Sequence, residues 1–559
     1  MTEARQYFTR QKNLHDVDIC ITSIPSRPEA IFLGFQHFIV MLGSTVIVPS
    51  AIVPLMGGGD REKAEAIQVS LFMAGLNTLL QILLGTRLPV VIGASHKFVL
   101  PAVYIGLADR HNIHTDPHDR FKSCMRGIQG ALIIASIFPI LAGLLRLWEK
   151  IVGLLSPLSD AFLTILNGLG LIVQYSAQAR LEQCVAIGIP EFLILIIFSK
   201  YLPKVKSSKF KRFFERYAVL LSIAIVWPYA ALLTAGGTYK NSPPSTQSNC
   251  RVDRSGLIGS TPWIRFPRPF QWGFPTVNVG EAFLMMAAAF IAFVESTGTF
   301  DAAARYGGAT PPPFYVHNRG VGCLGISILL DGFFGTVSGS AVLEENVGLL
   351  GLTRVGSRRV VQISAGFMLF FSVFGKFGAV LASIPLPIFG ALHCFLDSYL
   401  PSAGFDFLQW CNLNTFRVKS MLGTSSLSIL ALLSMPRYSN GRIVTSCGIP
   451  VTSSGNWFKK LKQVILTAPA TIAVSSTVIL DHTISKDHTV HLEVAPPLDV
   501  EVIPPPQFPE QRTSTFYPMI IDDDSGRHWW KKFREIEGDT RNEERRRDDG
   551  YFVIYFVSL

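Results

Sequence analysis

Long apolar runs alternate with short polar segments from residue 30 to residue 482. A helix needs about 20 consecutive apolar residues to cross the hydrocarbon core of a bilayer. About fourteen runs approach this length, so the pattern predicts a polytopic helical membrane protein. The predicted segments are 30–53, 66–85, 90–107, 128–147, 155–175, 182–201, 217–236, 280–300, 320–338, 340–352, 359–384, 386–401, 420–435 and 463–482.

A polar loop at 237–279, rich in Gly, Pro and Ser, divides these segments into two halves. In each half, two long runs are followed by a short, Gly-containing one, at 93–107 and at 339–352. Interrupted apolar segments at matching places in two halves point to the binding site of a transporter. Seven segments per half is an odd number, so the halves would have opposite orientations and form an inverted repeat.

The distribution of Lys and Arg predicts the orientation. The basic segments 200–216 and 353–359 are predicted to be cytoplasmic, although the basic loop 434–462 would then face outward. The predicted parts are a cytoplasmic segment (1–29), a first repeat (30–236), an extracellular loop (237–279), a second repeat (280–482) and a cytoplasmic tail (483–559). The tail is Pro-rich and then highly charged, so it is expected to be largely disordered.

The composition also indicates a membrane protein. The chain is 49% hydrophobic and 16% charged, whereas soluble domains carry about a quarter charged residues. The net charge of +10 does not indicate nucleic-acid binding, because the basic residues lie in short loops and in the tail. The first apolar run is too long for a cleaved signal peptide and is expected to act as an uncleaved signal anchor.

The eight cysteines form neither a CxxC pair nor a Cys/His cluster with zinc spacing. No metal site and no disulfide framework are therefore expected, and most cysteines should be small packing residues. Cys250 is the exception, because it lies in the polar loop. The sequence has no nucleophile–base constellation either, so an enzyme is not expected and no cofactor is implied.

Ionisable residues inside apolar runs are the candidates for function, since each costs energy in the membrane. Glu295 lies at the end of the run 280–300. Its carboxylate could accept N–H bonds from a ring and could carry a proton, or it could simply end a helix facing water. Asp160, Asp331 and Asp397 also lie in or near apolar runs, and the sequence assigns them no role.

Glu345 and Asn346 follow a Gly/Ser stretch at 335–341, where a short helix can begin in mid-membrane. The N-terminus of such a helix presents free N–H groups and a partial positive charge. A planar, polar ring could bond to those N–H groups and to Glu345 together. The alternative is a re-entrant loop that only touches water.

Two further polar groups interrupt the apolar pattern. Gln36 and His37 form a pair inside the first segment, where a packing role for the histidine is about as plausible as binding. Ser95 and His96 lie in the short segment 93–107. Lys97 is difficult to bury there and is predicted to snorkel to the surface or to line a cavity.

Three motifs resemble those of the nucleobase–ascorbate transporter family. The stretch at 344–356 reads EENVGLLGLTRVG and is similar to the family signature, GFQHFIVMLG (34–43) is similar to its Gln-His motif, and FVESTGTF (293–300) is similar to the eighth segment with its substrate-binding Glu. The likeness extends from about Val17 to Asp481 and is closest to plant members. The matching signature residues are Glu345, Asn346, Gly348, Thr353, Arg354 and Gly356.

This resemblance implies an all-α fold of fourteen segments in a seven-plus-seven inverted repeat, with two short broken helices preceded by short strands. Segments 1–4 and 8–11 would form a core domain that moves like an elevator against a gate domain of segments 5–7 and 12–14. Members of the family work as homodimers. The implied activity is proton-coupled symport of nucleobases such as purines, xanthine or uracil, most simply across the plasma membrane.

The resemblance also implies roles for individual residues. Glu295 and Glu345 would hold the base and are the candidates for proton coupling. Ser95 and His96 would lie beside the base. Gln36, His37 and Asn346 would support the geometry, and Arg417 would belong to the gate near a specificity filter.

The chain departs from the family pattern at His96, Lys97, Asp331 and Glu344. His96 stands where an aromatic ring usually stacks on the base, and Glu344 where the residue is usually small or apolar. Two alternatives therefore stay open: a carrier of ascorbate or another organic anion, and a divergent copy that does not transport. Two nearby acids disfavour an anion unless one of them is protonated.

Overall fold

The computed structural model describes residues 17–111, 116–152, 157–178, 181, 184–204, 208–254, 257–309, 312–408, 419, 423, 436–439, 442–445, 457–466 and 468–483. The predictions for Arg417, for the segment 420–435 and for the tail beyond residue 483 lie outside the described residues.

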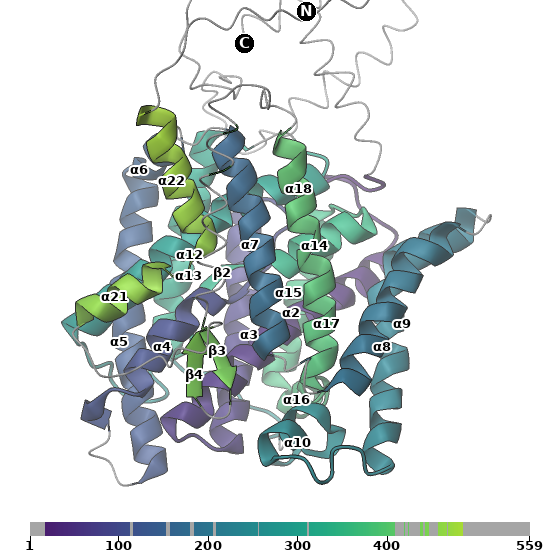
Figure 1. Ribbon diagram of the computed structural model, residues 1–559, viewed down its shortest axis with the longest axis horizontal. Coiled ribbons are helices and arrows are strands. Elements are labelled where there is room, and N and C mark those ends of the chain that lie inside the picture. The colour runs from purple at the N-terminus through teal and green to yellow at the C-terminus, as the bar shows by residue number, and fades with distance from the viewer. Residues whose placement is uncertain are drawn as a thin grey trace, which may run out of the picture.

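The described chain is a bundle of helices with two small sheets (Figure 1). The first half contains α2 (Arg27–Ile52), η1 (Val53–Met56), α3 (Asp60–Leu83), β1 (Ile92–Ala94), η2 (His96–Phe98), α4 (Val99–Gly106), η3 (Asp109–His111), α5 (Pro117–Leu144), α6 (Leu147–Val152), α7 (Pro157–Gln178), α8 (Val185–Ile196), η4 (Ile197–Tyr201), η5 (Leu202–Lys204) and α9 (Ser208–Ala235).

The polar loop contains α10 (Pro244–Cys250), η6 (Val252–Arg254) and α11 (Leu257–Ser260). The second half contains α12 (Val279–Tyr306), α13 (Phe314–Phe334), β2 (Ser340–Val342), α14 (Glu344–Thr353), α15 (Arg358–Val373), α16 (Gly375–Ala382), α17 (Leu386–Asp397), α18 (Tyr399–Leu408), β3 (Pro436–Ser439), β4 (Arg442–Thr445), α21 (Trp457–Leu466) and α22 (Pro469–Thr483).

Many of the predicted segments correspond to single helices. Among the described residues, six helices are long and apolar enough to cross a membrane, and a seventh span is possible if α15 and α16, bent by 108°, count as one. Other predicted segments are shorter or broken. The segment 386–401, for example, is divided between α17 and α18 at Ser398.

The two short apolar segments meet at the centre of the fold, where β1 pairs antiparallel with β2. Ile92 lies opposite Val342, and Ala94 lies opposite Ser340. A short helix follows each strand, which confirms the prediction of two short helices preceded by short strands. Both strands are fully buried, so the pairing satisfies backbone groups that have no access to water.

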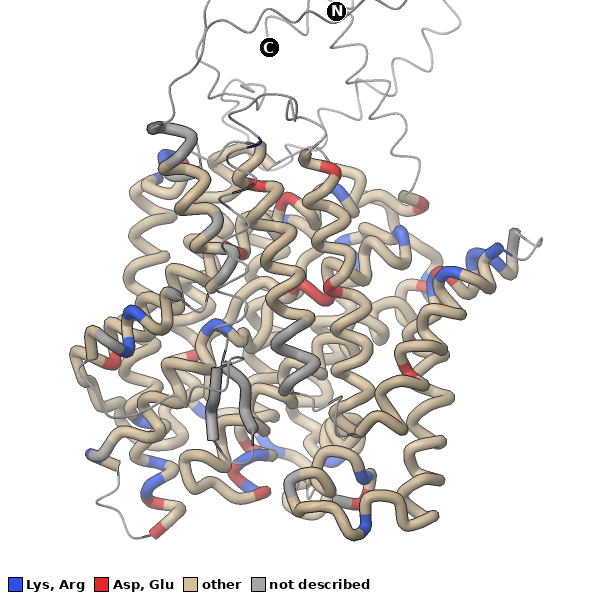
Figure 2. The backbone as a smooth tube through the Cα atoms, in the orientation of Figure 1, with Lys and Arg blue, Asp and Glu red and all other residues tan. Residues whose placement is uncertain are grey.

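One end of the bundle contains residues of the two basic segments that are predicted to be cytoplasmic, 200–216 and 353–359. Arg216, near the start of α9, forms an ion pair with Asp18 at 3.0 Å and another with Glu29. The backbone N–H of Asp18 donates to the carbonyl of Arg354 at 3.0 Å. Lys and Arg positions cluster at this end of α9 (Figure 2). The segments 200–216 and 353–359 therefore lie on the same side of the protein.

A disulfide lies at the other end. Cys184, just before α8, is bonded to Cys250 at the end of α10, and α10 lies at the opposite end of α9 from its basic start (Figure 1). The expectation of no disulfide framework was wrong for this pair. The two cysteines are separated by 66 residues, and sequence spacing carries no signal for a bond between segments so far apart.

Reduction of this disulfide should destabilise the protein. The bond closes a long loop, and removing such a bond from a protein costs about 2–5 kcal/mol. We expect the thermal unfolding midpoint of purified protein to fall when a reductant is added. A Cys184→Ser/Cys250→Ser variant should begin at the lower midpoint and show no further change, and a reductant effect that persists in this variant would contradict the assignment.

Candidate binding site between two short helices

Lys97 forms the centre of a buried cluster of charges. Its Nζ lies 2.6 Å from Oε1 of Glu344 and 3.1 Å from Oε2 of Glu295, and its side chain is 8% exposed. The prediction that Lys97 snorkels was wrong, because two carboxylates compensate its charge inside the protein. Acidic positions also lie near mid-height of the bundle in Figure 2, away from the ends where loops meet water.

The β1–β2 pairing positions this cluster. Lys97 lies in η2, directly after β1, and Glu344 is the first residue of α14, directly after β2. The N–H of Ser95 donates to the carbonyl of Gly339 at 3.1 Å, and the Ser95 hydroxyl accepts from the N–H of Lys97 at 3.3 Å. The two short helices therefore begin side by side, and α12 supplies Glu295 from a third direction.

Asn167 of α7 is a member of the site that the sequence reasoning missed. Its Nδ2 donates to Oε1 of Glu344 at 3.1 Å and to the hydroxyl of Thr299 at 3.4 Å. This amide joins α7 to α14 and α12. A signal was present, because Asn167 is a buried amide within the apolar run 155–175.

The acids that meet at Lys97 differ in part from the predicted pair of Glu295 and Glu345. Lys97 joins Glu295 to Glu344, the residue that precedes the predicted Glu345. Glu345 is fully buried in the first turn of α14. The charges of Glu344, Glu345 and Lys97 also act on Asp397 at the end of α17. Lys97 is therefore paired with two acids, and Asp397 lies within electrostatic range of Lys97, Glu344 and Glu345.

Polar groups of α2 also contact α14. Asn346 donates from Nδ2 to the carbonyl of His37 at 2.9 Å and lies 3.2 Å from its Nδ1, so this amide joins α14 to α2. Gln36 is fully buried, and its amide nitrogen and oxygen have no hydrogen-bond partner among the described residues. A buried amide in this state calls for a ligand or a water. His96 is buried beside Lys97.

The second half of the signature shapes the backbone. Thr353 donates its hydroxyl to the carbonyl of Leu349 at 2.8 Å. Arg354 ends α14 with φ at 58°, and Gly356 donates its N–H to the carbonyl of Ile19 at 2.8 Å. A Cβ on Gly356 would lie 2.4 Å from Cα of Gly307. These residues end the short helix and connect it to the segment before α2.

Asp331 belongs to a separate polar group that supports β2. Its Oδ1 accepts from Nδ2 of Asn77 at 3.2 Å, and the same amide contacts the hydroxyl of Ser340 at 3.2 Å. The contact connects α3, α13 and β2. Asp331 thus positions the strand that leads into α14.

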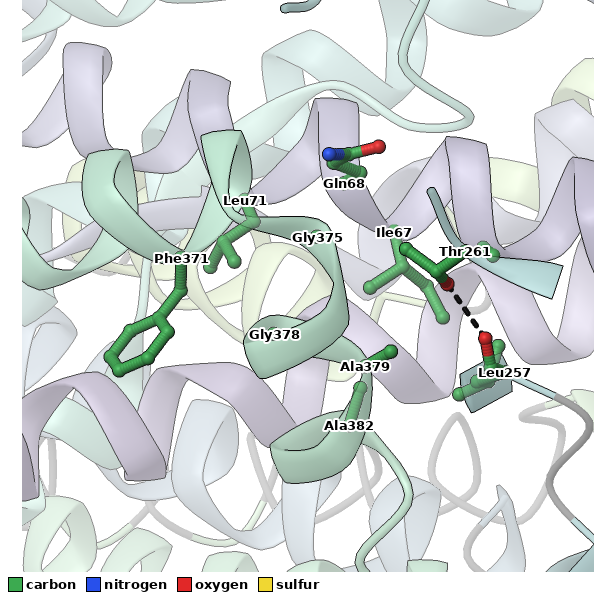
Figure 3. A pocket seen from close by; sticks show the side chains of 11 residues that line it. Ile67, Gln68, Leu71, Leu257, Thr261, Phe371, Gly375, Gly378, Ala379 and Ala382 are labelled. Atoms are coloured by element: carbon green, nitrogen blue, oxygen red, sulfur yellow. Dashed lines mark hydrogen bonds between the residues drawn. The ribbon is translucent and has the colours of Figure 1, made fainter. Parts of the chain in front are cut away.

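No group of metal ligands competes with this cluster in the part of the chain that the structure describes. His, Cys, Asp and Glu form no group there that could hold a metal ion. A small apolar cavity of about 20 Å³ lies near Gln68, Thr261 and Gly375 (Figure 3). That volume holds about one water, and none of the candidate residues lines it.

The ion pair between Lys97 and Glu344 gives a direct stability prediction. Removing one partner of a buried pair costs about 3–5 kcal/mol, because the other charge is left uncompensated. Lys97→Met and Glu344→Gln should each lower the thermal unfolding midpoint of purified protein. The double variant should lose less than the sum of the two, and strictly additive losses would contradict the pair.

Comparison with known proteins identifies the family. The family model described as "Permease family" matches residues 28–435. Nucleobase-ascorbate transporter 4 of Arabidopsis thaliana is 50% identical over 537 residues, which cover 96% of this chain and 95% of that protein. Nucleobase-ascorbate transporter 6 of the same plant is 48% identical, over 95% and 93% of the two chains.

A solved structure of SLC26A9 is similar over 72% of this chain and 61% of that one, at 11% identity and a TM-score of 0.45. The relatives in sequence are named transporters, which confirms that the chain is not an enzyme. With its apolar helices, the chain is an integral membrane transporter. It belongs to the nucleobase–ascorbate transporter family of permeases.

Proposed function

We propose that this protein carries a nucleobase together with a proton across the plasma membrane. The observation that carries the proposal is the position of Glu295, which is 4% exposed and faces the start of α14 through Lys97. The relatives named as nucleobase–ascorbate transporters share about half of its residues over nearly its whole length. The proposed substrate is a nucleobase such as xanthine, another purine or uracil.

The site offers both a hydrogen-bond acceptor and hydrogen-bond donors, and a nucleobase requires both. A ring N–H can donate to a carboxylate such as Glu295, in a charge-assisted bond. A ring carbonyl can accept from the N–H groups of the first turn of α14, which have no acceptor within the helix itself. This helix has ten residues and begins at Glu344. Glu345 lies in the same turn, and the unpaired amide of Gln36 can complete the contacts. Ser95 and His96 would lie beside the ring.

An elevator mechanism in a seven-plus-seven repeat is supported by the central pairing. β1 of the first half and β2 of the second run antiparallel, as two related units of opposite orientation would. The core would comprise α2–α5 and α12–α16, and the gate α7–α9 with α17, α18 and α22. Asn167 of the gate would then bond to Glu344 of the core, and this bond would break as the core moves. Two chains would form a homodimer.

The disulfide supports the orientation. Disulfides persist in oxidising compartments and are rare in the cytosol. Cys184 and Cys250 would therefore face outward, and the basic end of α9 would face the cytoplasm, in agreement with the positive-inside rule. An outward oxidising face suits the plasma membrane.

The charge of the site favours a neutral base over an anion such as ascorbate. Glu295 and Glu344 pair with Lys97, and Glu344, Glu345 and Lys97 act on Asp397. Lys97 is already paired with two carboxylates, so its ammonium is not available to a substrate anion. The second alternative is a divergent copy that does not transport. In such a copy, Lys97 would stay paired with Glu295 and Glu344 permanently and would occupy the place of a ligand.

Uptake of radiolabelled compounds tests the proposal. A transport-deficient microbial host expressing the protein would be given xanthine, uric acid, adenine, guanine, uracil and ascorbate, with and without a protonophore. We expect uptake of a base that the protonophore suppresses. Uptake of ascorbate alone would favour the anion carrier, and no uptake by protein shown to be at the surface would favour the divergent copy.

A further inference from the structure

Asp397 is a buried acid that neither the motifs nor the ion pairs explain. It is fully buried at the C-terminal end of α17. Neither of its carboxylate oxygens has a hydrogen-bond partner among the described residues. A lone carboxylate in such surroundings costs so much energy that the group takes up a proton instead.

The surroundings of Asp397 add to this cost. Glu344 and Glu345 of α14 act on it as like charges, and Lys97 is the one described cation that acts on it. That cation is held by Glu344 and Glu295 at 2.6 and 3.1 Å. Lys97 thus balances the acids that it touches and leaves Asp397 without a partner.

Several other charged or titratable groups near α17 have partners of their own. On α2, His37 contacts Asn346, and His393 of α17 itself contacts the carbonyl of Val40. On α8, Glu191 accepts from Ser222 of α9. Lys200 of η4 contacts the hydroxyl of Tyr399, and Asp406 of α18 pairs with Arg305 of α12. None of these contacts reaches Asp397.

The packing of α14 on α17 places Asp397 at a boundary that transport would change. Gly348 of α14 approaches the carbonyl of Leu396 so closely that a Cβ would lie 2.1 Å from that oxygen. Leu396 directly precedes Asp397. In the proposed elevator, α14 belongs to the moving core and α17 to the gate, so movement would carry Glu344 and Glu345 away from Asp397.

We propose that Asp397 binds the proton that is coupled to substrate transport. The inference rests on the proposed function and assigns the proton to an acid other than the two expected from the family motifs. With α14 beside it, Asp397 holds a proton. When Glu344 and Glu345 move away, their repulsion is lost and the carboxyl can release the proton to water. Glu295, paired with Lys97, would hold the base.

The test uses Asp397→Asn, which keeps the shape of the side chain and removes the titration. Glu191→Gln is the matched control, since Glu191 is also a fully buried gate acid but is bonded to Ser222. Each full-length protein would be reconstituted in vesicles. Exchange of labelled for unlabelled base at equal pH would be compared with uphill uptake driven by a pH gradient, for the base that the wild type carries best.

We expect Asp397→Asn to keep exchange within about twofold of the wild type and to lose uphill uptake, while Glu191→Gln keeps both. Uphill uptake by Asp397→Asn at the wild-type level would overturn the proposal. Loss of both activities in correctly folded Asp397→Asn would also overturn it, because Asp397 would then be needed for movement itself.

An infrared spectrum separates this inference from the proposed function. A protonated carboxyl has a C=O stretch that a carboxylate lacks, and it can be recorded on purified protein that transports nothing. We expect part of this band to be missing in Asp397→Asn. If the wild type carries no base, the proposed function and the coupling role both fail, but a missing band would still establish the proton site. An unchanged band would overturn the inference even if the wild type transports.

Discussion

Glu295→Gln should reduce uptake by about 10-fold to 100-fold while the protein remains in the membrane at its normal level. The carboxylate of Glu295 is placed to accept a ring N–H, and a hydrogen bond to a charged group contributes about 1.5–3 kcal/mol. Each 1.4 kcal/mol corresponds to about a factor of ten. The measurement is initial-rate uptake of the best base, normalised to surface protein.

Glu281→Gln is the matched control on the same helix. Glu281 lies in the first turn of α12 and pairs with Arg110. It is separated from Glu295 by fourteen residues of α12, which corresponds to about 21 Å of helix. This variant should keep most of its uptake. Equal uptake by Glu295→Gln and the wild type would remove Glu295 from the mechanism.

Gly348→Ala should cause the largest structural loss. The added Cβ would lie 2.1 Å from the carbonyl oxygen of Leu396 and 2.7 Å from its carbonyl carbon. Both are backbone atoms, so no side chain can move aside, and α14 must shift away from α17. Overpacking a well-packed interior costs about 1–3 kcal/mol, and sometimes more. The same shift would displace Glu344 and Glu345.

We therefore expect less folded protein at the surface, a lower thermal midpoint and little uptake by the protein that remains. Gly366→Ala in α15 provides the control, because no atom lies within 4 Å of the Cβ it would add. Alanine is preferred over glycine inside a helix by about 1 kcal/mol, so this variant should be neutral or slightly more stable. A wild-type midpoint for Gly348→Ala would contradict the close packing of α14 on α17.

Hydrophobic patterning predicted the helices well where an apolar run was long and continuous. The run 280–300 corresponds to α12 (Val279–Tyr306), and the run 30–53 to α2 (Arg27–Ile52). Such runs are long because a helix needs about 20 apolar residues to cross the bilayer. The short runs at 93–107 and 339–352 were also predicted as short segments, because Gly and Ser interrupt their apolar pattern.

Long-range pairing explains what the sequence could not predict. Lys97 appeared unsuited to burial until the β1–β2 pairing placed it against Glu344, a residue 247 positions away along the chain. The bond between Cys184 and Cys250 depends in the same way on α10 lying near the start of α8. Asn167 was missed because a single amide in an apolar run does not reveal which residues of other helices it will contact.

A cryo-EM structure of the purified protein with the base that gives the highest uptake tests the proposed binding site most directly. We expect density for one planar ring against the carboxylate of Glu295 and the first N–H groups of α14, with Gln36 or His96 in contact. Density for the base at another place, with the ion pairs of Lys97 to Glu295 and Glu344 intact and no ligand beside them, would contradict it.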